Sequence, residues 1–260
     1  MVGGDRRVRI TSVKNPLIAS LRALKAKKAR EDMGLFLVEG EVMLREALSS
    51  GLVPRAMLSE AETELAACFP EAHIVPRSIL EAVCDTRTPQ PVCAAFEIPA
   101  STPLADAPDR LAALDGVQDP GNVGTIWRTA DAAGLQGLLL GEGCADAFSP
   151  KVQRAAMGSG FRLPAIPAEP LAEALRELRA RGYRVIASAL DGEDFRLMPD
   201  VGEKFVLVIG SEARGVSDEV RREADFLAKL PMRGRAESLN AAVAAGIMMY
   251  ALMREREGCR

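Results

Sequence analysis

From residue 111 onward, short apolar runs alternate regularly with segments of helical periodicity. Such alternation is typical of a parallel sheet covered by helices on both faces, because parallel strands need long crossover connections. The expected strands are residues 111–114, 137–140, 184–189, 205–209 and 226–230. The expected helices are residues 123–133, 149–157, 171–181, 217–224 and 238–254, the second of them capped by Ser149. The second half therefore predicts an α/β domain with a parallel sheet.

The first hundred residues predict a smaller α/β unit. Leucines at helical spacing indicate an amphipathic helix over residues 15–30, and Gly34 lies beyond its end. Residues 99–108 are rich in Pro, Ala, Ser and Asp, as linkers are. The elements expected between them begin with a strand at 35–38, a helix at 40–49 and a strand at 53–59. We therefore expect a domain over 1–100, a linker over 101–109 and a second domain over 110–260.

Composition excludes several classes of protein. The chain has 260 residues, and no run approaches the roughly 18 consecutive apolar residues of a membrane helix. Five cysteines without a CxxC pair argue against a zinc finger or a disulfide framework. The single histidine, His73, argues against a histidine-based metal site and a histidine base. We therefore expect a cytoplasmic protein with no metal and no attachment to a membrane.

Positive charge is concentrated near the N-terminus. The net charge of the chain is −3, but residues 1–30 contain nine basic side chains and only Asp5 as an acid. Such a segment is suited to contact phosphates, and the alternative is a solvated helix face without a ligand. The candidate contacts are Arg9, Lys14, Arg22, Lys25 and Lys28.

Three loops of the second half follow predicted strands, where ligands bind in open parallel sheets. The first, residues 114–128, contains several glycines, an asparagine that is a candidate helix cap, Asn122, and Arg128. Free N–H groups at the start of its helix would suit an anion. The alternative is an ordinary strand-to-helix turn with a surface arginine.

The second and third loops are also rich in glycine and polar residues. Residues 208–216 place Glu212 directly after a buried strand, between two glycines, where it is either a ligand acceptor or a solvated loop acid. In residues 230–240, Ser238 and Asn240 open the last helix, and Ser238 is the expected cap.

Other signals are weaker or missing. The acids Asp191, Glu193 and Asp194 follow a predicted strand and are interpreted as solvated turn residues. Neither GxGxxG in a dinucleotide context nor GxxxxGK[ST] occurs, so an NAD enzyme and a P-loop protein lose support.

In order and spacing, the three loops resemble the three motifs of the SpoU/TrmH family, the RNA 2′-O-ribose methyltransferases of the SPOUT class. The N-terminal half is similar to that family's RNA-binding domain around residues 10–15, 36–40 and 46–48. One departure is Ala241-Ala242, where relatives often have Val-Ser, and we expect it to affect packing more than chemistry. The matching residues are Asn122, Gly124 and Arg128, then Gly210, Glu212 and Gly215, then Pro231, Met232, Gly234, Ser238, Leu239 and Asn240.

The resemblance implies a C-terminal α/β domain with a trefoil knot, a rare exception to the rule against threaded chains. It also implies that S-adenosylmethionine binds in this knot. A homodimer is expected as well, and the apolar helix over 239–253 is consistent with a partner surface. The residues expected around the cofactor are Ala189, Leu190, Ile209, Gly210, Gly215, Leu230, Met232, Ser238 and Leu239.

The family pattern implies a catalytic group formed by Asn122, Arg128, Glu212, Ser238 and Asn240. An arginine is normally always protonated, so Arg128 is interpreted as a clamp that stabilises the developing alkoxide rather than as a base. The expected substrate is structured RNA gripped by the basic N-terminal segment, with ribosomal RNA favoured over transfer RNA. The alternatives are a transfer-RNA enzyme, a methyltransferase for a base nitrogen, and a non-catalytic protein that binds RNA or assists ribosome assembly.

Overall fold

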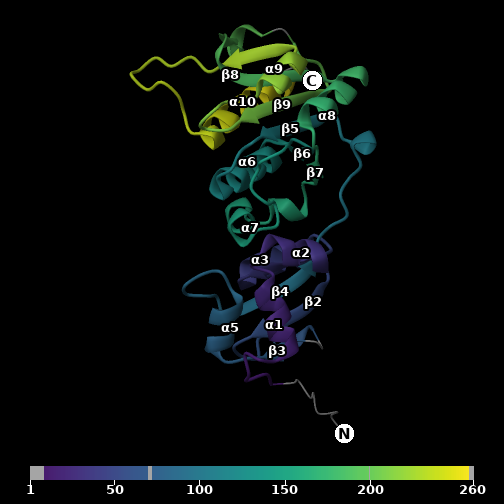
Figure 1. The fold of residues 1–260 in the computed structure, drawn as a ribbon, viewed down its shortest axis with the longest axis vertical. Coiled ribbons are helices and arrows are strands. Elements are labelled where there is room, and N and C mark those ends of the chain that lie inside the picture. The colour runs from purple at the N-terminus through teal and green to yellow at the C-terminus, as the bar shows by residue number, and fades with distance from the viewer. Residues whose placement is uncertain (1–8, 70–71, 199, 258–260) are drawn as a thin grey trace. The chain divides into compact units, whose positions relative to one another are not determined.

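The computed structural model describes residues 9–69, 72–198 and 200–257. The chain forms two compact units, which Figure 1 shows in its purple-to-blue and its green-to-yellow parts. Unit 1 comprises Met1–Pro99 and Phe148–Gln153, and unit 2 comprises Ala100–Ala147 and Arg154–Arg260. The break after Pro99 falls beside the expected linker, whereas Phe148–Gln153 groups with unit 1 although it lies within the predicted second domain.

Unit 1 is built on a four-stranded mixed sheet with the order β1-β4-β2-β3. The strand β4 is antiparallel to both of its neighbours, and β2 is parallel to β3. Buried apolar side chains of the strands and helices form its core, Phe36, Leu58 and Ile79 among them. Its elements are α1 Pro16–Ala23, α2 Lys27–Met33, β1 Leu35–Glu39, α3 Glu41–Ser49, β2 Pro54–Ser59, α4 Glu64–Ala67, β3 Ala72–Ile74, α5 Arg77–Val83 and β4 Val92–Glu97.

The single helix predicted over residues 15–30 is wrong, because the structure has two helices, α1 and α2, separated by a turn. Arg30 explains the break. Its side chain is buried, and Nη1 donates to the carbonyl oxygens of Leu24 at 2.6 Å and Lys25 at 2.9 Å. The arginine thus satisfies carbonyl groups that a continuous helix would have bonded internally. Leucine periodicity alone does not reveal this interaction.

Replacing Arg30 with methionine is expected to lower the free energy of unfolding of unit 1 by about 2–4 kcal/mol. The apolar side chain would fill the space but leave the turn carbonyls without their charged donor. Thermal and urea unfolding measure the change. Lys28→Met, an exposed cation of the same helix, is the control and should stay within about 0.5 kcal/mol of wild type. Equal stability of the two variants would refute this role.

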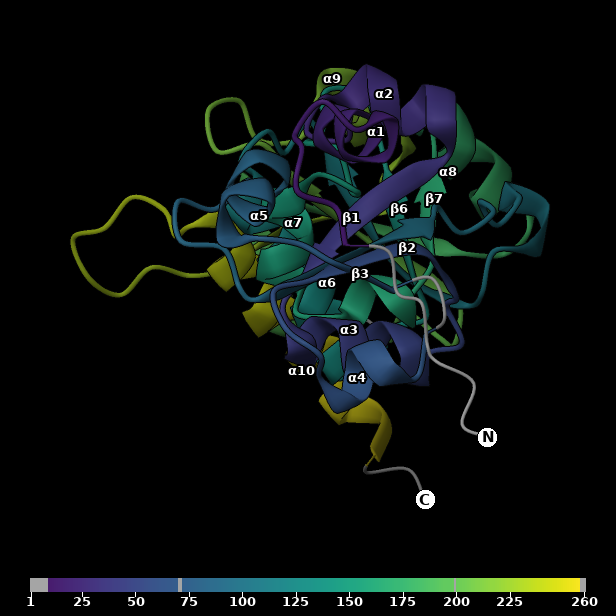
Figure 2. The same cartoon turned by 90° about the horizontal axis from the view of Figure 1, so that it is seen from below.

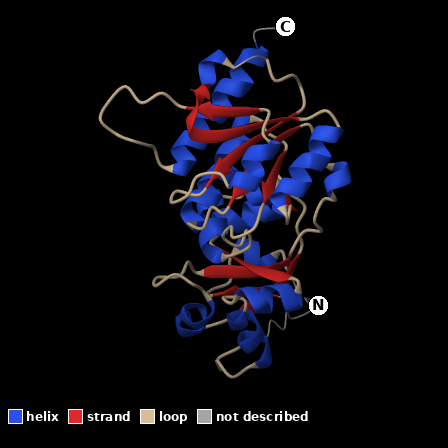
Figure 3. Cartoon of the chain, turned by 45° about the horizontal axis from the view of Figure 1, so that its top comes forward, coloured by secondary structure: helices blue, strands red, loops and turns tan. Residues whose placement is uncertain are grey.

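Unit 2 contains a six-stranded sheet with the order β10-β8-β9-β5-β6-β7, and every pairing in it is parallel. The predicted parallel α/β sheet is therefore confirmed (Figure 3). The pattern missed β7, and β8 continues five residues beyond its predicted end. The strands are β5 Arg110–Asp115, β6 Gly137–Leu140, β7 Ala165–Pro167, β8 Arg184–Asp194, β9 Phe205–Gly210 and β10 Phe226–Lys229.

The strands of this sheet are buried on both faces, and β9 has no exposed residue. Alternate side chains of β5 and β9, such as Leu111 and Val206, pack with Leu175 and Leu178 of α8. Beyond the strands, α10 packs against both α6 and β9. The helices and 3-10 turns are η1 Leu104–Asp106, α6 Pro120–Ala133, α7 Pro150–Ala156, η2 Ser159–Phe161, α8 Leu171–Ala180, η3 Phe195–Leu197, α9 Asp218–Glu223 and α10 Ala241–Glu257.

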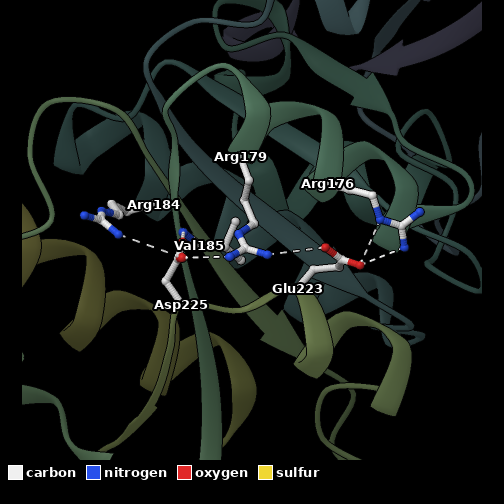
Figure 4. A network of polar contacts seen from close by, with 6 residues as sticks. All are labelled: Arg176, Arg179, Arg184, Val185, Glu223 and Asp225. Carbon is white, nitrogen blue, oxygen red and sulfur yellow. Dashed lines mark hydrogen bonds and ion pairs between the residues drawn. The ribbon is translucent and has the colours of Figure 1, made fainter.

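Two acids at the end of α9, Glu223 and Asp225, bind arginines of α8, and Asp225 also binds the backbone of β8, as Figure 4 shows. Glu223 accepts from Arg176 at 2.7 Å and pairs with Arg179 at 3.5 Å. Asp225 accepts from Arg179 at 3.1 Å and from the backbone N–H of Val185 at 2.8 Å. These mostly buried carboxylates have their partners, so the cluster is structural. Among the described residues, no helix is long and apolar enough to cross a membrane.

Candidate functional site

The candidate site lies where β5, β9 and β10 end. All three strands run in the same direction, so their carboxyl ends face one edge of the sheet. Asp115, the last residue of β5, pairs directly with Gly210, the last residue of β9. The loops that carry Asn122 and Glu212 therefore begin side by side.

A chain of side-chain hydrogen bonds connects the three loops. The amide nitrogen of Asn122 donates to Glu212 Oε1, a very short contact. Asn240 Nδ2 donates to Asn122 Oδ1 at 2.9 Å. Three of the five predicted catalytic residues, one from each loop, are thus in direct contact. Because Asn122 uses both its donor and its acceptor, its amide orientation is fixed.

The caps of the two helices at the site differ from the prediction. Asp119, not Asn122, caps α6, because its Oδ1 accepts from the N–H of Asn122 at 2.8 Å. Asn240, not Ser238, caps α10, because its Oδ1 accepts from Ala242 at 2.9 Å and Val243 at 3.2 Å. The helix Pro120–Ala133 starts earlier than predicted. Asn122 therefore lies in its first turn, and its side chain contacts Glu212 and Asn240 instead of capping the helix. The cap Ser149 predicted for α7 is confirmed by a 3.4 Å bond to Val152.

The other two predicted catalytic residues are exposed and lie outside this hydrogen-bonded chain. Arg128 lies on α6, about 9 Å along the helix axis from Asn122. Among the described residues, its guanidinium makes no hydrogen bond or ion pair. Ser238 lies in the loop before α10, also without a side-chain partner among the described residues. Both side chains are accessible to a ligand.

The loop after β9 is a tight turn that presents Glu212. Ser211 and Gly215 exchange two backbone hydrogen bonds, of 3.1 and 2.8 Å. Gly210 permits this closure, since a Cβ there would lie 2.1 Å from the Gly215 carbonyl carbon. Asp115 anchors the exit of the turn, because its Oδ2 accepts from the N–H of Ser217 at 2.6 Å. Sequence analysis missed Asp115, although its place directly after a buried strand was a usable signal.

The end of β8 forms the next wall of the site. Its pairing with β10 jumps from Ala187 to Glu193, so residues 188–192, which include the predicted cofactor residues Ala189 and Leu190, leave the ladder. Gly192 lies so close to β10 that a Cβ would be 2.3 Å from the Leu227 oxygen. The interpretation of the acids in this segment as turn residues is wrong, since they belong to the extended β8, whereas Asp191 and Glu193 are exposed as expected.

Two of these acids form ion pairs. Asp191 accepts from Arg221 at 2.8 Å, and Asp194 accepts from Arg196 through both carboxylate oxygens. Arg196 holds the pKa of Asp194 at about 2, so this carboxylate is ionised at neutral pH.

A cavity of about 330 Å³ lies between the end of β8 and the loop before α10. Three of the nine predicted cofactor residues line it, namely Leu230, Met232 and Leu239. Its other lining residues are Phe195, Arg196, Pro231, Arg233, Gly234, Ala236 and Ile247. The remaining candidates, Ala189, Leu190, Ile209, Gly210, Gly215 and Ser238, are not part of this lining. Sequence analysis missed Phe195 and Arg196, which lie in an unremarkable polar segment.

The candidate phosphate contacts of unit 1 are all exposed: Arg9, Lys14, Arg22, Lys25 and Lys28. The buried Arg30 is not available to a ligand. His73 lies in β3 of this unit. Within the described ranges, no group of three or more His, Cys, Asp or Glu side chains is arranged to hold a metal ion.

Two protein-family models match the chain. The SpoU rRNA Methylase family matches residues 109–250, and the MRM3-like substrate binding domain matches residues 15–94. Together they cover both units. The first match contains all three loops, and the second contains three of the five candidate phosphate contacts, Arg22, Lys25 and Lys28.

Individual proteins agree with these models. The chain is 38% identical over 247 residues to the 23S rRNA (guanosine(2553)-2′-O)-methyltransferase RlmP of Bacillus subtilis, covering 94% of this chain and 98% of that protein. It resembles the crystal structure of AdoMet-bound rRNA methyltransferase from Sinorhizobium meliloti with a TM-score of 0.86 and 35% identity, over 97% and 99% of the two chains.

A further solved structure is the SpoU methyltransferase AviRb from Streptomyces viridochromogenes in complex with AdoMet. It has a TM-score of 0.84 and 28% identity, over 95% of this chain and 100% of that one. With both the family model and near-complete relatives in agreement, the chain belongs to the SpoU rRNA methylase family.

Proposed function

We propose that this protein transfers a methyl group from S-adenosylmethionine to a ribose 2′-hydroxyl of ribosomal RNA. The observation that carries the proposal is the contact of Asn122 with both Glu212 and Asn240, which unites the three family motifs in one polar centre. The names of the relatives support the ribose position and the ribosomal substrate. A cytoplasmic location follows from this substrate.

The residues present fit S-adenosylmethionine. The cavity volume of about 330 Å³ lies in the usual range for small-molecule sites, and Leu230, Met232 and Leu239 give it an apolar lining suited to an adenosine. Bound there, the cofactor supplies an activated methyl on a sulfonium. The predicted cofactor residues outside this lining lie on the neighbouring elements: Ala189 and Leu190 in β8, Ile209 and Gly210 at the end of β9, Gly215 in the turn after it, and Ser238 in the loop before α10. The trefoil knot implied by the family resemblance is part of this proposal.

The side chains have distinct tasks in the proposed reaction. Glu212 uses Oε1 for Asn122, which leaves Oε2 to accept a hydrogen bond from the ribose hydroxyl. Arg128, exposed and without a partner among the described residues, stabilises the negative charge that develops on the hydroxyl oxygen. Asn240 acts through Asn122 and the helix cap, and is therefore a positioning residue. Ser238 completes the polar wall.

Asp115→Ala is expected to raise the KM for S-adenosylmethionine about tenfold, because the turn that ends at Ser217 loses a charge-assisted hydrogen bond. Ser217→Ala is the matched control: it retains the backbone N–H, and the Ser217 side chain makes no cap bond. Steady-state kinetics at saturating RNA measure both variants. Equal KM values for Asp115→Ala and Ser217→Ala would contradict the anchoring role.

We also propose that the active form is a homodimer. Four exposed apolar side chains, Leu239, Val243, Ile247 and Tyr250, follow one another at intervals of four, four and three positions. The last three therefore form a stripe on one face of α10. Because Leu239 and Ile247 also line the cavity, a second copy on this face would adjoin the cofactor site. Mass measurement in solution tests this: a monomer at assay concentrations overturns it.

The substrate class is tested by methyl incorporation. Full-length protein and S-adenosylmethionine with a labelled methyl would be incubated with unmethylated ribosomal RNA, transfer RNA and large-subunit assembly particles. We expect label in ribosomal RNA or in the particles. Label confined to transfer RNA would replace the proposed substrate with the alternative. RNA binding without label on any of these substrates would favour a non-catalytic role.

A further inference from the structure

Half of the fourteen arginines of unit 2 whose side chains the structure describes form ion pairs with carboxylates. Ion pairs of 4.0 Å or less join them to acids on neighbouring elements, as the cluster in Figure 4 illustrates. The paired arginines are Arg110, Arg162, Arg176, Arg179, Arg184, Arg196 and Arg221. Five others, namely Arg128, Arg214, Arg222, Arg233 and Arg235, have neither an ion pair nor a side-chain hydrogen bond among the described residues.

Four of these five unpaired arginines lie on the second and third motif loops or on α6, the helix that follows the start of the first motif loop. Arg128 belongs to α6, Arg214 to the turn after β9, and Arg233 and Arg235 to the loop before α10. All four are exposed, and their guanidinium groups make no ion pair or hydrogen bond with any residue that the structure describes. Four guanidinium groups around the candidate site are therefore available to a ligand.

The nearby acids are already engaged. Asp119 caps α6, Asp115 holds Ser217, and Glu212 accepts from Asn122. Asp194, which directly precedes the cavity-lining Phe195, is bound through both oxygens by Arg196 and stays ionised. Glu237, in the loop before α10, is exposed and without a hydrogen bond among the described residues. These carboxylates keep their negative charge, but none of them pairs with one of the four arginines among the described residues, so the guanidinium groups can contact an anionic ligand directly.

The loop that carries Arg233 and Arg235 is placed to reach a large ligand. Every residue from Arg233 to Asn240 is exposed. The yellow loop between β10 and α10 extends away from the sheet of its unit in Figures 1 and 2. Its base lines the cavity, where Arg233 is a lining residue beside Met232. The cofactor has a single carboxylate, which occupies one arginine at most. Four guanidinium groups spread over α6 and two loops instead match several phosphates of a nucleic-acid strand.

We propose that Arg128, Arg214, Arg233 and Arg235 form a phosphate-binding rim on unit 2, which grips the RNA backbone on either side of the nucleotide to be methylated. The inference deepens the proposed function and rests on it. It assigns RNA contact to the catalytic unit itself, in addition to the basic surface of unit 1. Arg233 and Arg235 hold the strand through phosphate contacts, which position the RNA without reading its sequence.

The double variant Arg214→Gln/Arg235→Gln, whose two arginines lie outside the cavity lining, tests the rim, with Arg222→Gln as its matched control. Arg222 is an exposed arginine of the same unit, on α9 outside the three loops, and it too has no ion pair among the described residues. The probe is an unmethylated ribosomal RNA transcript, and its affinity for the full-length protein is measured from low to physiological salt. S-adenosylmethionine affinity is measured in parallel.

We expect the double variant to bind RNA about 10–100-fold more weakly at low salt, and the slope of log affinity against log salt to flatten by about 1.4 for two lost single-strand phosphate contacts. Arg222→Gln should match wild type, and S-adenosylmethionine affinity should not change. An RNA affinity and slope equal to those of Arg222→Gln would overturn the proposal. So would a selective loss of S-adenosylmethionine affinity, which would assign the arginines to the cofactor carboxylate.

These results are independent of methyl transfer. If the protein binds RNA through the rim but transfers no methyl group, the proposed function fails while the rim stands. If methyl transfer proceeds and the double variant keeps wild-type RNA affinity and salt dependence, the rim fails while the proposed function stands.

Discussion

Arg128→Ala is expected to lower kcat about 10²–10³-fold while S-adenosylmethionine binds with nearly unchanged affinity. The side chain is exposed and has no partner among the described residues, so its removal breaks no internal contact that would destabilise the fold. What it removes is the charge that stabilises the oxyanion in the transition state. Single-turnover methyl transfer, together with cofactor titration, separates the two effects.

Arg128→Lys is the conservative comparison. It retains the positive charge but not the planar guanidinium, so we expect intermediate turnover. Turnover of Arg128→Ala close to wild type would refute the assignment. A parallel loss of cofactor affinity would instead place the arginine at the cofactor rather than at the ribose.

Asn240→Asp is expected to reduce kcat about 10–100-fold with little change in Tm. Aspartate caps a helix as well as asparagine does, so the bonds to Ala242 and Val243 persist. The donor to Asn122 Oδ1 is lost, however, and two oxygens now face each other. Asn122 can no longer hold its orientation toward Glu212.

Asn240→Ala separates the two roles of this residue. It removes the cap as well as the donor, so it should lower stability by about 1 kcal/mol in addition to the loss of turnover. If Asn240→Asp keeps wild-type kcat, the hydrogen-bonded chain does not position the reacting group. An equal fall in stability for Asn240→Asp and Asn240→Ala would show that Asn240 affects turnover only through the stability of α10.

Five of the six strands of unit 2 were predictable because they contain short, continuous apolar runs, as in the buried central strands β5 and β9. The extension of β8 was not, since its last residues are polar, and its pairing with Ala228 and Lys229 of β10 depends on a distant part of the chain. The break between α1 and α2 depends on one buried arginine, Arg30, in a segment whose leucines continue the helical period.

Three residues of the site could be named from the sequence, but the helix caps and ion pairs around them could not. Motif order named Asn122, Glu212 and Asn240, and the structure places them in contact. Sequence spacing did not show which residues cap the helices, because Asp119 and Asn122 are both good caps and only the helix start decides between them. It also did not show which arginines are paired, because the acids of six of the seven paired arginines of unit 2 are 30 or more positions away, as with Arg221 and Asp191.

The central claim, methyl transfer to a ribose oxygen, is tested most directly by locating the methyl group. Unmethylated ribosomal RNA is incubated with the full-length protein and S-adenosylmethionine carrying a labelled methyl, then digested to nucleosides and separated. We expect the label in a single 2′-O-methylnucleoside, and its loss in Arg128→Ala. Label on a base would contradict the claim.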